Sequence, residues 1–166
     1  SLGHATFMAL GCYLNINFLG AGVPWLIAFP LSGLIAGALG TMIALPVLRL
    51  HGVYLALATF GFAVATPQLL KFDAFEHWTG GVQGIFVPKP EPLMEGLSAD
   101  QSLYYVAFGI MVALMVGAWC IIHSRSGRAM MAIRDNPIAA ATMGVNLPMV
   151  KTTTFGISAM YAGIGG

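Results

Sequence analysis

The sequence predicts an all-α fold, a polytopic bundle of transmembrane helices of which this chain holds an incomplete set. Of its 166 residues, 58% are hydrophobic and only 8% are charged, whereas a soluble domain carries about 25% charged residues. Four apolar runs approach the roughly 20 residues that a helix needs to cross a bilayer, and none of them contains Asp, Glu, Lys or Arg. The net charge of +1 provides no basic field that would bind nucleic acid.

The four runs span residues 5–22, 24–48, 52–70 and 102–122. Asn15 and Asn17 interrupt the first run, so a re-entrant or bundle-buried helix is an alternative to a full span there. A fifth run begins after Lys151 and reaches Gly166; at 1.5 Å per residue it covers about 22 Å of a core of about 30 Å. Since the chain also begins at Ser1 without a basic leader, we expect residues 1–166 to be one transmembrane domain and a fragment of a longer protein.

The charges between the runs predict the orientation. Five of the seven basic residues fall in the two connections that alternating spans place on the same side: Arg49, Arg125, Arg128, Arg134 and Lys151. The positive-inside rule makes that side the cytoplasm. Segment 71–101 carries five of the six acidic residues and is expected to form an outer loop, whereas segment 123–150 forms a cytoplasmic loop.

Small residues recur along the second run, which reads LSGLIAGALGTMIAL over residues 31–45. Gly33 and Gly37 form a GxxxG pair, with Ala36, Gly40 and Ala44 one step round the helix. Small side chains at this spacing let two membrane helices approach closely. We therefore expect this face to be buried against other helices, including helices beyond the fragment, and not to form a ligand site.

The segment 124–146, SRSGRAMMAIRDNPIAAATMGVN, is the least apolar part of the second half of the chain. An arginine at mid-bilayer costs about 2.5–3.5 kcal/mol, so the three arginines and Asp135 place this segment in water. Pro137 disfavours helix at Asn136, which predicts one helix over 127–134 and a second that starts at Pro137 with Asn136 as its N-cap. Gly144 suits a C-terminal cap, and we expect the chain to re-enter the membrane near Lys151.

The second short helix, residues 137–143, carries no charge, although a solvated helix usually has a polar face. Ala139, Ala140 and Met143 would form a small apolar surface suited to a groove on a partner protein. Burial of Met143 alone would contribute roughly 1.5–3 kcal/mol. Packing of this face on the chain's own bundle is an alternative of about equal weight.

The same segment resembles the cytoplasmic coupling loop of ATP-binding-cassette (ABC) permeases for branched-chain amino acids. That loop is written Glu-Ala-Ala, three residues, Gly; here Ile138 stands at the Glu position, followed by Ala139, Ala140 and, four residues on, Gly144. SLGHATFMALGCY, LPVLRLHGVYLALATFGFA, TGGVQGI and FGISAMYAGIGG resemble further parts of the same family, in order along nearly the whole chain. The similarity is to the second, M-type permease subunit, although Ala141 stands where members often carry a Glu.

The resemblance implies a permease subunit of an ATP-driven importer in a bacterial inner membrane, with no enzymatic activity or cofactor of its own. Two ATPase subunits would grip the cytoplasmic loops, a sister permease would complete the bundle, and an extracytoplasmic binding protein would deliver leucine, isoleucine or valine. Related permeases carry urea, short amides or other small organic substrates instead. The residues implied in coupling to the ATPase are Arg128, Arg134, Asp135, Asn136, Pro137, Ile138, Ala139, Ala140, Met143 and Gly144. For each of the two arginines taken alone, a positive-inside role is favoured over a coupling contact.

Uncharged polar residues within the apolar runs are the candidates for a translocation path: Asn15, Asn17, Thr59, Thr66 and Gln68. Proton-coupled carriers generally need an ionisable residue at membrane depth, and its absence from these runs favours transport driven by ATP. Each of these residues also suits an ordinary hydrogen bond between helices.

Two rival functions fit the sequence less well. An intramembrane enzyme needs a nucleophile with a base, or a pair of acids, at membrane depth, whereas the four histidines are scattered and no HExxH motif occurs. A passive channel or purely structural subunit has no need for an apolar cytoplasmic helix with caps at both ends.

Overall fold

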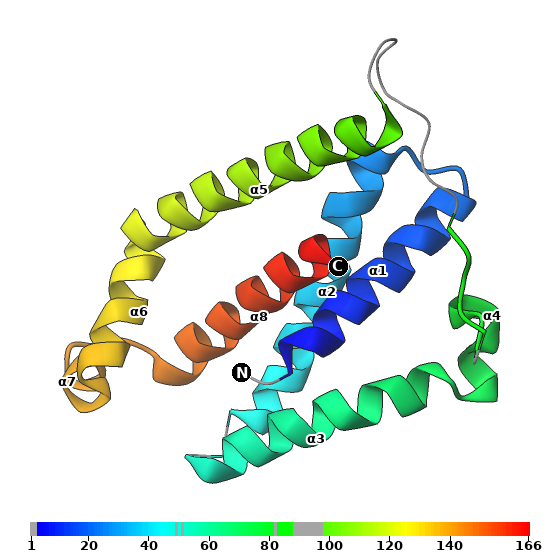
Figure 1. Ribbon diagram of the computed structural model, residues 1–166. Coiled ribbons are helices and arrows are strands. Elements are labelled where there is room, and N and C mark those ends of the chain that lie inside the picture. The colour runs from blue at the N-terminus through cyan, green and yellow to red at the C-terminus, as the bar shows by residue number, and fades with distance from the viewer. Residues whose placement is uncertain (1–2, 49, 51, 82, 88–97) are drawn as a thin grey trace. The chain divides into compact units, whose positions relative to one another are not determined.

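The computed structural model describes residues 3–48, 50, 52–81, 83–87 and 98–166, and every regular element among them is helical (Figure 1). The residues Arg49, Lys89, Glu91 and Glu95, which enter the orientation argument, lie outside this described part. The elements in chain order are α1 (His4–Gly20), α2 (Trp25–Val47), α3 (Val53–Leu70), the 3-10 helix η1 (Asp73–Phe75), α4 (Glu76–Thr79), α5 (Ala99–His123), α6 (Arg125–Asp135), α7 (Pro137–Thr142) and α8 (Leu147–Gly165).

The chain forms two compact units. The first consists of Ser1–Ile85 together with Asn146–Gly166 and contains α1 to α4 and α8. The second, Phe86–Val145, contains α5, α6 and α7. The prediction of a single transmembrane domain over 1–166 stays a prediction.

Among the described residues, three helices are long and apolar enough to cross a membrane: α2, α3 and α5. They confirm the predicted spans 24–48, 52–70 and 102–122. The first run forms α1, which has 17 residues, about 25 Å of helix. Helix α1 buries Thr6, Phe7 and Gly11, and both a full span and a helix packed in the bundle stay open for residues 5–22.

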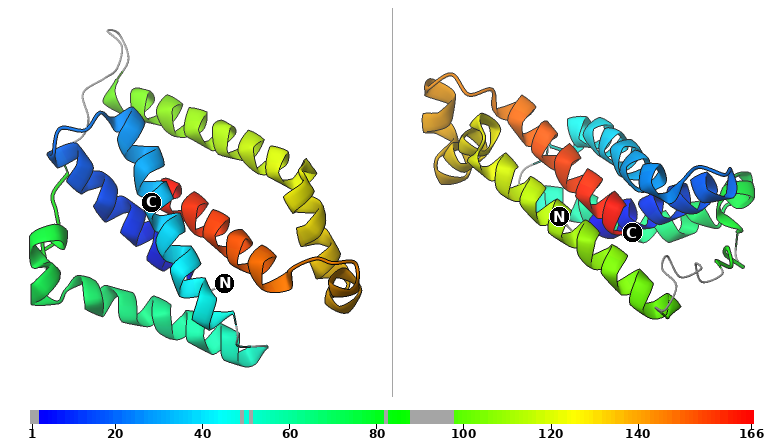
Figure 2. Two further views of the ribbon diagram at one scale, coloured as in Figure 1. Left: turned by 180° about the vertical axis from the view of Figure 1, so that it is seen from behind. Right: turned by 90° about the horizontal axis from the view of Figure 1, so that it is seen from above.

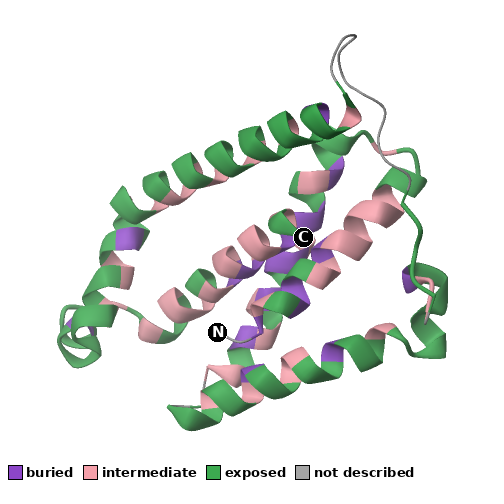
Figure 3. Ribbon diagram, in the orientation of Figure 1, coloured by how far each residue is buried: buried purple, intermediate pink, exposed green. Residues whose placement is uncertain are grey.

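The core of the first unit is the contact between α2 and α8, which lie against each other in the different views of Figure 2. The small residues of α2 are buried at this contact, as the purple bands of Figure 3 show. A Cβ placed on Gly37 would lie 3.0 Å from Cβ of Met160 and 3.1 Å from the carbonyl oxygen of Gly156. Helix α8 also has glycines at this contact. A Cβ on Gly163 would lie only 2.5 Å from Cβ of Ala36, so a side chain there would overlap α2. The predicted burial of the GxxxG face is confirmed, and its partner lies within the chain.

Helix α1 crosses the same core. Gly11 meets the backbone of Gly163 so closely that a Cβ at Gly11 would overlap it. The ring of Phe7 is 1% exposed and lies edge-on to Phe155 of α8, with 5.8 Å between ring centroids. On its other side it approaches Phe62 of α3, at 6.2 Å. The Thr6 hydroxyl also meets the Thr66 hydroxyl of α3 at 2.8 Å in a buried hydrogen bond, which attaches α3 to α1.

Gly40→Ala tests how closely α2 and α8 must approach. A Cβ at Gly40 would overlap Cβ of Ala159 and lie 3.6 Å from Cε1 of Phe7. Because the Ala159 Cβ is fixed to its backbone, the helices have to separate, and we expect a loss of about 1–3 kcal/mol of stability. The measurement is the midpoint of thermal unfolding of the detergent-purified protein.

Gly61→Ala is the matched control for that variant. A Cβ on Gly61 of α3 would meet nothing within 4 Å, and alanine is favoured over glycine in a helix by about 1 kcal/mol. Its midpoint should stay the same or rise. Equal midpoints for the two variants would show that α2 and α8 are not closely packed.

Candidate functional site

The segment that follows α5 is built from two short helices with hydrogen-bonded ends. The Ser124 side chain caps α6 by accepting a hydrogen bond from the Gly127 amide at 3.3 Å. On α6, Arg128 donates to the carbonyl of His123 at 3.3 Å. Arg134 pairs with Asp135 at 3.0 Å, but both side chains are exposed, and such a surface pair contributes little stability.

The break between α6 and α7 lies at the predicted place. The Asn136 side-chain oxygen accepts from the amides of Ile138 and Ala139, each at 3.0 Å, and Pro137 takes the first helical position. At the other end Gly144 has φ +82°, the left-handed conformation that glycine adopts without strain. Its amide donates to Ala141, and the next amide, that of Val145, donates to Ala140. This pair of bonds is a Schellman motif, so both predicted caps are confirmed.

The exposed surface of α7 differs from the predicted one. Ile138 is 77% exposed and Met143 is 85% exposed, whereas Ala140 is only 4% exposed. The surface of Ala139, Ala140 and Met143 expected from the sequence is therefore corrected: Ala140 is covered by its own chain. The large apolar side chains that are exposed on α7 and its C-cap are Ile138 and Met143.

The segment ends where helix α8 begins. Helix α8 starts at Leu147 with Asn146 as its N-cap, and re-entry into the membrane near Lys151 stays a prediction. The Asn146 side-chain oxygen accepts from the Met149 amide at 3.1 Å, and Pro148 lies in the first turn. An Asn N-cap with Pro in the first turn also starts α7 at Asn136-Pro137. The start of α8 was therefore predictable from the sequence by the same signal.

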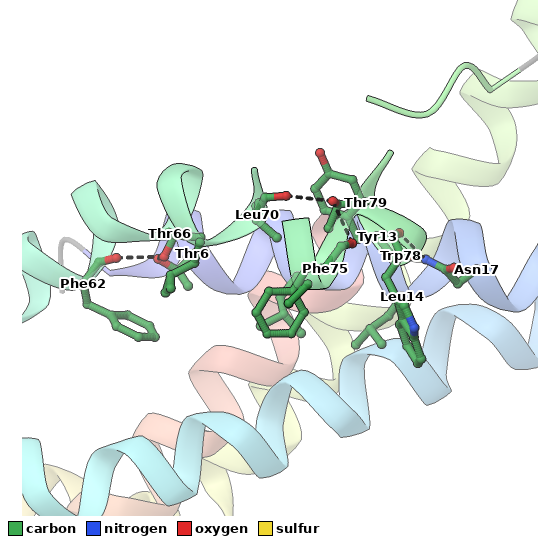
Figure 4. Close-up of a pocket in the computed structure, with 13 residues that line it drawn as sticks. Thr6, Tyr13, Leu14, Asn17, Phe62, Thr66, Leu70, Phe75, Trp78 and Thr79 are labelled. Atoms are coloured by element: carbon green, nitrogen blue, oxygen red, sulfur yellow. Dashed lines mark hydrogen bonds between the residues drawn. The ribbon is translucent and has the colours of Figure 1, made fainter. Parts of the chain in front are cut away.

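A second feature is an apolar cavity of about 540 Å³ in the first unit, lined by α1, α3, η1 and α4. Of the predicted path residues, it brings together Asn17 and Thr66. Thr6, Tyr13 and Thr79 also line it, and sequence reasoning missed them. Figure 4 shows these side chains with the rings of Phe75 and Trp78.

Hydrogen bonds within the unit already engage the amide and hydroxyl groups of the cavity's short polar residues. Besides the Thr6–Thr66 bond, the Thr66 hydroxyl donates to the carbonyl of Phe62 at 2.7 Å. The Asn17 amide donates to the carbonyls of Tyr13 and Trp78, at 2.7 and 2.9 Å. The Thr79 hydroxyl lies 2.7 Å from the Leu70 carbonyl. These side chains therefore hold α1, α3 and α4 together.

The remaining path residues lie elsewhere in the unit. Thr59 is buried, and its hydroxyl donates to the carbonyl of Ala56 at 3.0 Å. Gln68 is exposed on another face of α3, beside Phe60 and Val64. Asn15 stands apart, because its side-chain oxygen is buried and has no hydrogen-bond partner among the described residues. The five predicted residues thus do not form one continuous path within this chain.

The comparisons with known proteins agree with this architecture. Residues 1–166 match the family model for the permease component of the branched-chain amino acid transport system. The chain is 32% identical to the high-affinity branched-chain amino acid transport system permease protein LivM of Salmonella typhimurium (strain LT2), over 99% of this chain and 44% of LivM. For LivM of Escherichia coli (strain K12) the values are 33%, 99% and 44%.

A more distant relative is the autoinducer 2 import system permease protein LsrC of Enterobacter sp. (strain 638), which is 28% identical over 96% of this chain and 43% of its own length. No solved structure is significantly similar to the chain. The chain spans less than half the length of these relatives.

The apolar spanning helices and these matches define the class of protein, a transmembrane permease. Within that class, the chain belongs to the family of permease components of branched-chain amino acid transport systems. The resemblance stated from the sequence is confirmed.

Proposed function

We propose that the chain is part of the membrane-spanning permease subunit of an ATP-driven ABC importer in a bacterial inner membrane. A sister permease, two ATPase subunits and an extracytoplasmic binding protein complete the assembly. The observation that carries the proposal is the uncharged helix α7, capped at both ends, with Ile138 and Met143 exposed, in a chain whose full length matches this permease family.

Helix α7 suits the transmission of force from an ATPase. An isolated helix of this length is not stable in water, but the Asn136 cap and the Schellman motif hold its ends. Burial of Ile138 and Met143 in a groove of the ATPase would contribute roughly 1.5–3 kcal/mol each. A packed contact of this kind can bias a two-state bundle when the ATPase subunits close. Arg128 and Arg134 would stand beside it, facing acidic groups of the ATPase or lipid headgroups.

Leucine, isoleucine and valine are the proposed substrates, because LivM of two bacteria is named for branched-chain amino acid transport. Urea, short amides or other small organic compounds are the alternative cargo of the same importer class. The test is uptake of labelled leucine into proteoliposomes that contain the complete complex with ATP inside. ATP-dependent uptake of urea without uptake of leucine would overturn the substrate assignment.

The variants Ile138→Asp and Met143→Asp test the coupling role of α7. A carboxylate at either position opposes burial in an apolar groove, and we expect leucine uptake to fall at least tenfold while ATP hydrolysis continues. Ile138→Leu and Met143→Leu keep an apolar side chain and should retain uptake. Normal transport by both aspartate variants would show that α7 is not the transmitting contact.

Asn15 is the path residue that we propose contacts the substrate. Its buried side-chain oxygen has no donor among the described residues, an arrangement that costs about 1–3 kcal/mol, and the ammonium group of an amino acid would supply one. Asn15→Leu removes this acceptor, so we expect a roughly tenfold lower rate of leucine uptake, with protein stability equal to or higher than that of the wild type because an unpaired buried oxygen is lost. Thr153→Leu, at an exposed position of α8 outside the predicted path, is the control and should transport normally. An unaltered rate in Asn15→Leu would remove Asn15 from the path.

A further inference from the structure

The cavity beside α1 and α3 runs along a membrane span and continues past its end. On α3 it extends from Phe62 to Leu70, about 12 Å of helix, and Phe75 and Trp78 line it beyond the end of α3 (Figure 4). Its volume of about 540 Å³ lies within the 300–1,000 Å³ typical of ligand sites. The cavity therefore has the size and depth to hold a ligand that enters from the membrane surface.

The chemistry of the lining favours an apolar chain. No charged side chain lines the cavity in the described part of the protein, and the Thr6, Thr66 and Thr79 hydroxyls and the Asn17 amide are engaged within the unit. An amino acid would bring a charged ammonium and a carboxylate into a site with few groups to receive them, at a large desolvation cost. A hydrocarbon chain needs no such partners. The cavity is accordingly distinct from the proposed substrate contact at Asn15, which does not line it.

Charged groups gather where the cavity adjoins a second pocket of about 360 Å³. The two pockets share Tyr13, Thr66 and Leu70, and the second one is also lined by Lys71 and Gly81. The Glu76 side chain packs on Gly81, since a Cβ there would lie 3.2 Å from its carboxylate oxygen Oε1.

Asp73 in η1 adds another exposed acid at this end of the unit. A pocket that is lined by the cation Lys71 and flanked by the acid Glu76 is complementary to a headgroup that carries both charges more than to one that is only anionic.

We propose that this cavity binds one phospholipid with a zwitterionic headgroup. An acyl chain occupies the space between α1 and α3, the phosphate lies near Lys71, and the ammonium group faces Glu76. Trp78 lines the cavity beyond the end of α3, and tryptophan is enriched at membrane–water boundaries. The lipid would fasten α4 and η1 to the ends of α1 and α3.

The first test measures lipids that stay bound to the purified full-length permease complex after extensive washing in detergent, by mass spectrometry. Leu14→Trp enlarges a side chain that lines the cavity, and we expect at least a tenfold loss of retained phosphatidylethanolamine. Leu57→Trp places the same residue at a position of α3 that is 60% exposed and should retain it. Lys71→Gln should lower retention severalfold.

The second test does not depend on a cavity-filling variant. Phosphatidylethanolamine with a brominated acyl chain should quench the fluorescence of the wild type more than that of Trp78→Phe, because Trp78 lines the cavity. Brominated phosphatidylglycerol at the same concentration should quench severalfold less.

Any of three results would overturn the assignment. The wild type could retain no phospholipid, which would mean that another part of the protein fills the cavity. Leu14→Trp could retain as much phosphatidylethanolamine as the wild type, or the wild type could prefer phosphatidylglycerol. Leucine uptake is recorded separately, and its absence would bear on the transport proposal alone.

Discussion

The close contact between α2 and α8 is the interaction on which the first unit depends. Water drives little association between helices inside a bilayer, so their packing relies on dispersion contacts between closely spaced backbones. Gly37 and Gly40 on α2, with Gly156 and Gly163 on α8, permit that approach because they carry no Cβ. Helix α1 joins the pair through Gly11 and Phe7. Helix α3 is attached to α1 by the Thr6–Thr66 bond, and the cavity lies along these two helices.

A different constraint shapes α6 and α7, where caps take the place of close packing. The six-residue helix α7 is too short to persist in water by propensity. Asn136 satisfies two amides at its start, and Gly144 lets the chain turn back on its last carbonyls. Because these backbone and cap bonds hold α7, its ends do not depend on packing of Ile138 and Met143, which are exposed in the described chain. The proposed contact with an ATPase subunit would cover these two large apolar side chains.

Features that depend on local chemistry were predictable from the sequence. The three spans, the break at Asn136-Pro137, the glycine turn at Gly144 and the buried small face of α2 follow from hydropathy, backbone restriction and residue size. The start of α5 had a readable signal as well, since Ser98 and Gln101 form a capping box, although the predicted run began at 102. Similarly, helical periodicity separates Thr66 from Gln68 by about 200°, enough to place them on different faces.

Features set by tertiary packing could not be read in the same way. The burial of Ala140 depends on how α7 is rotated about its own axis, which three successive alanines do not specify. The orphaned oxygen of Asn15 depends on which donors surround it. Helix α4 and η1 are too short to produce a periodic pattern. Their contribution to the cavity arises from contacts such as that of Asn17 with the Trp78 carbonyl, far along the chain.

The distance in sequence between Gly37 and Gly156 has a consequence for synthesis of the protein. The partner of α2 is synthesised only after α3, α5, α6 and α7, because α8 follows them in the chain. Until α8 is made, the glycine face of α2 lacks the helix that later covers it. Non-local pairing of this kind is slow and leaves surfaces open to wrong associations. The insertion pathway must therefore keep nascent α2 apart from other copies while it waits for α8.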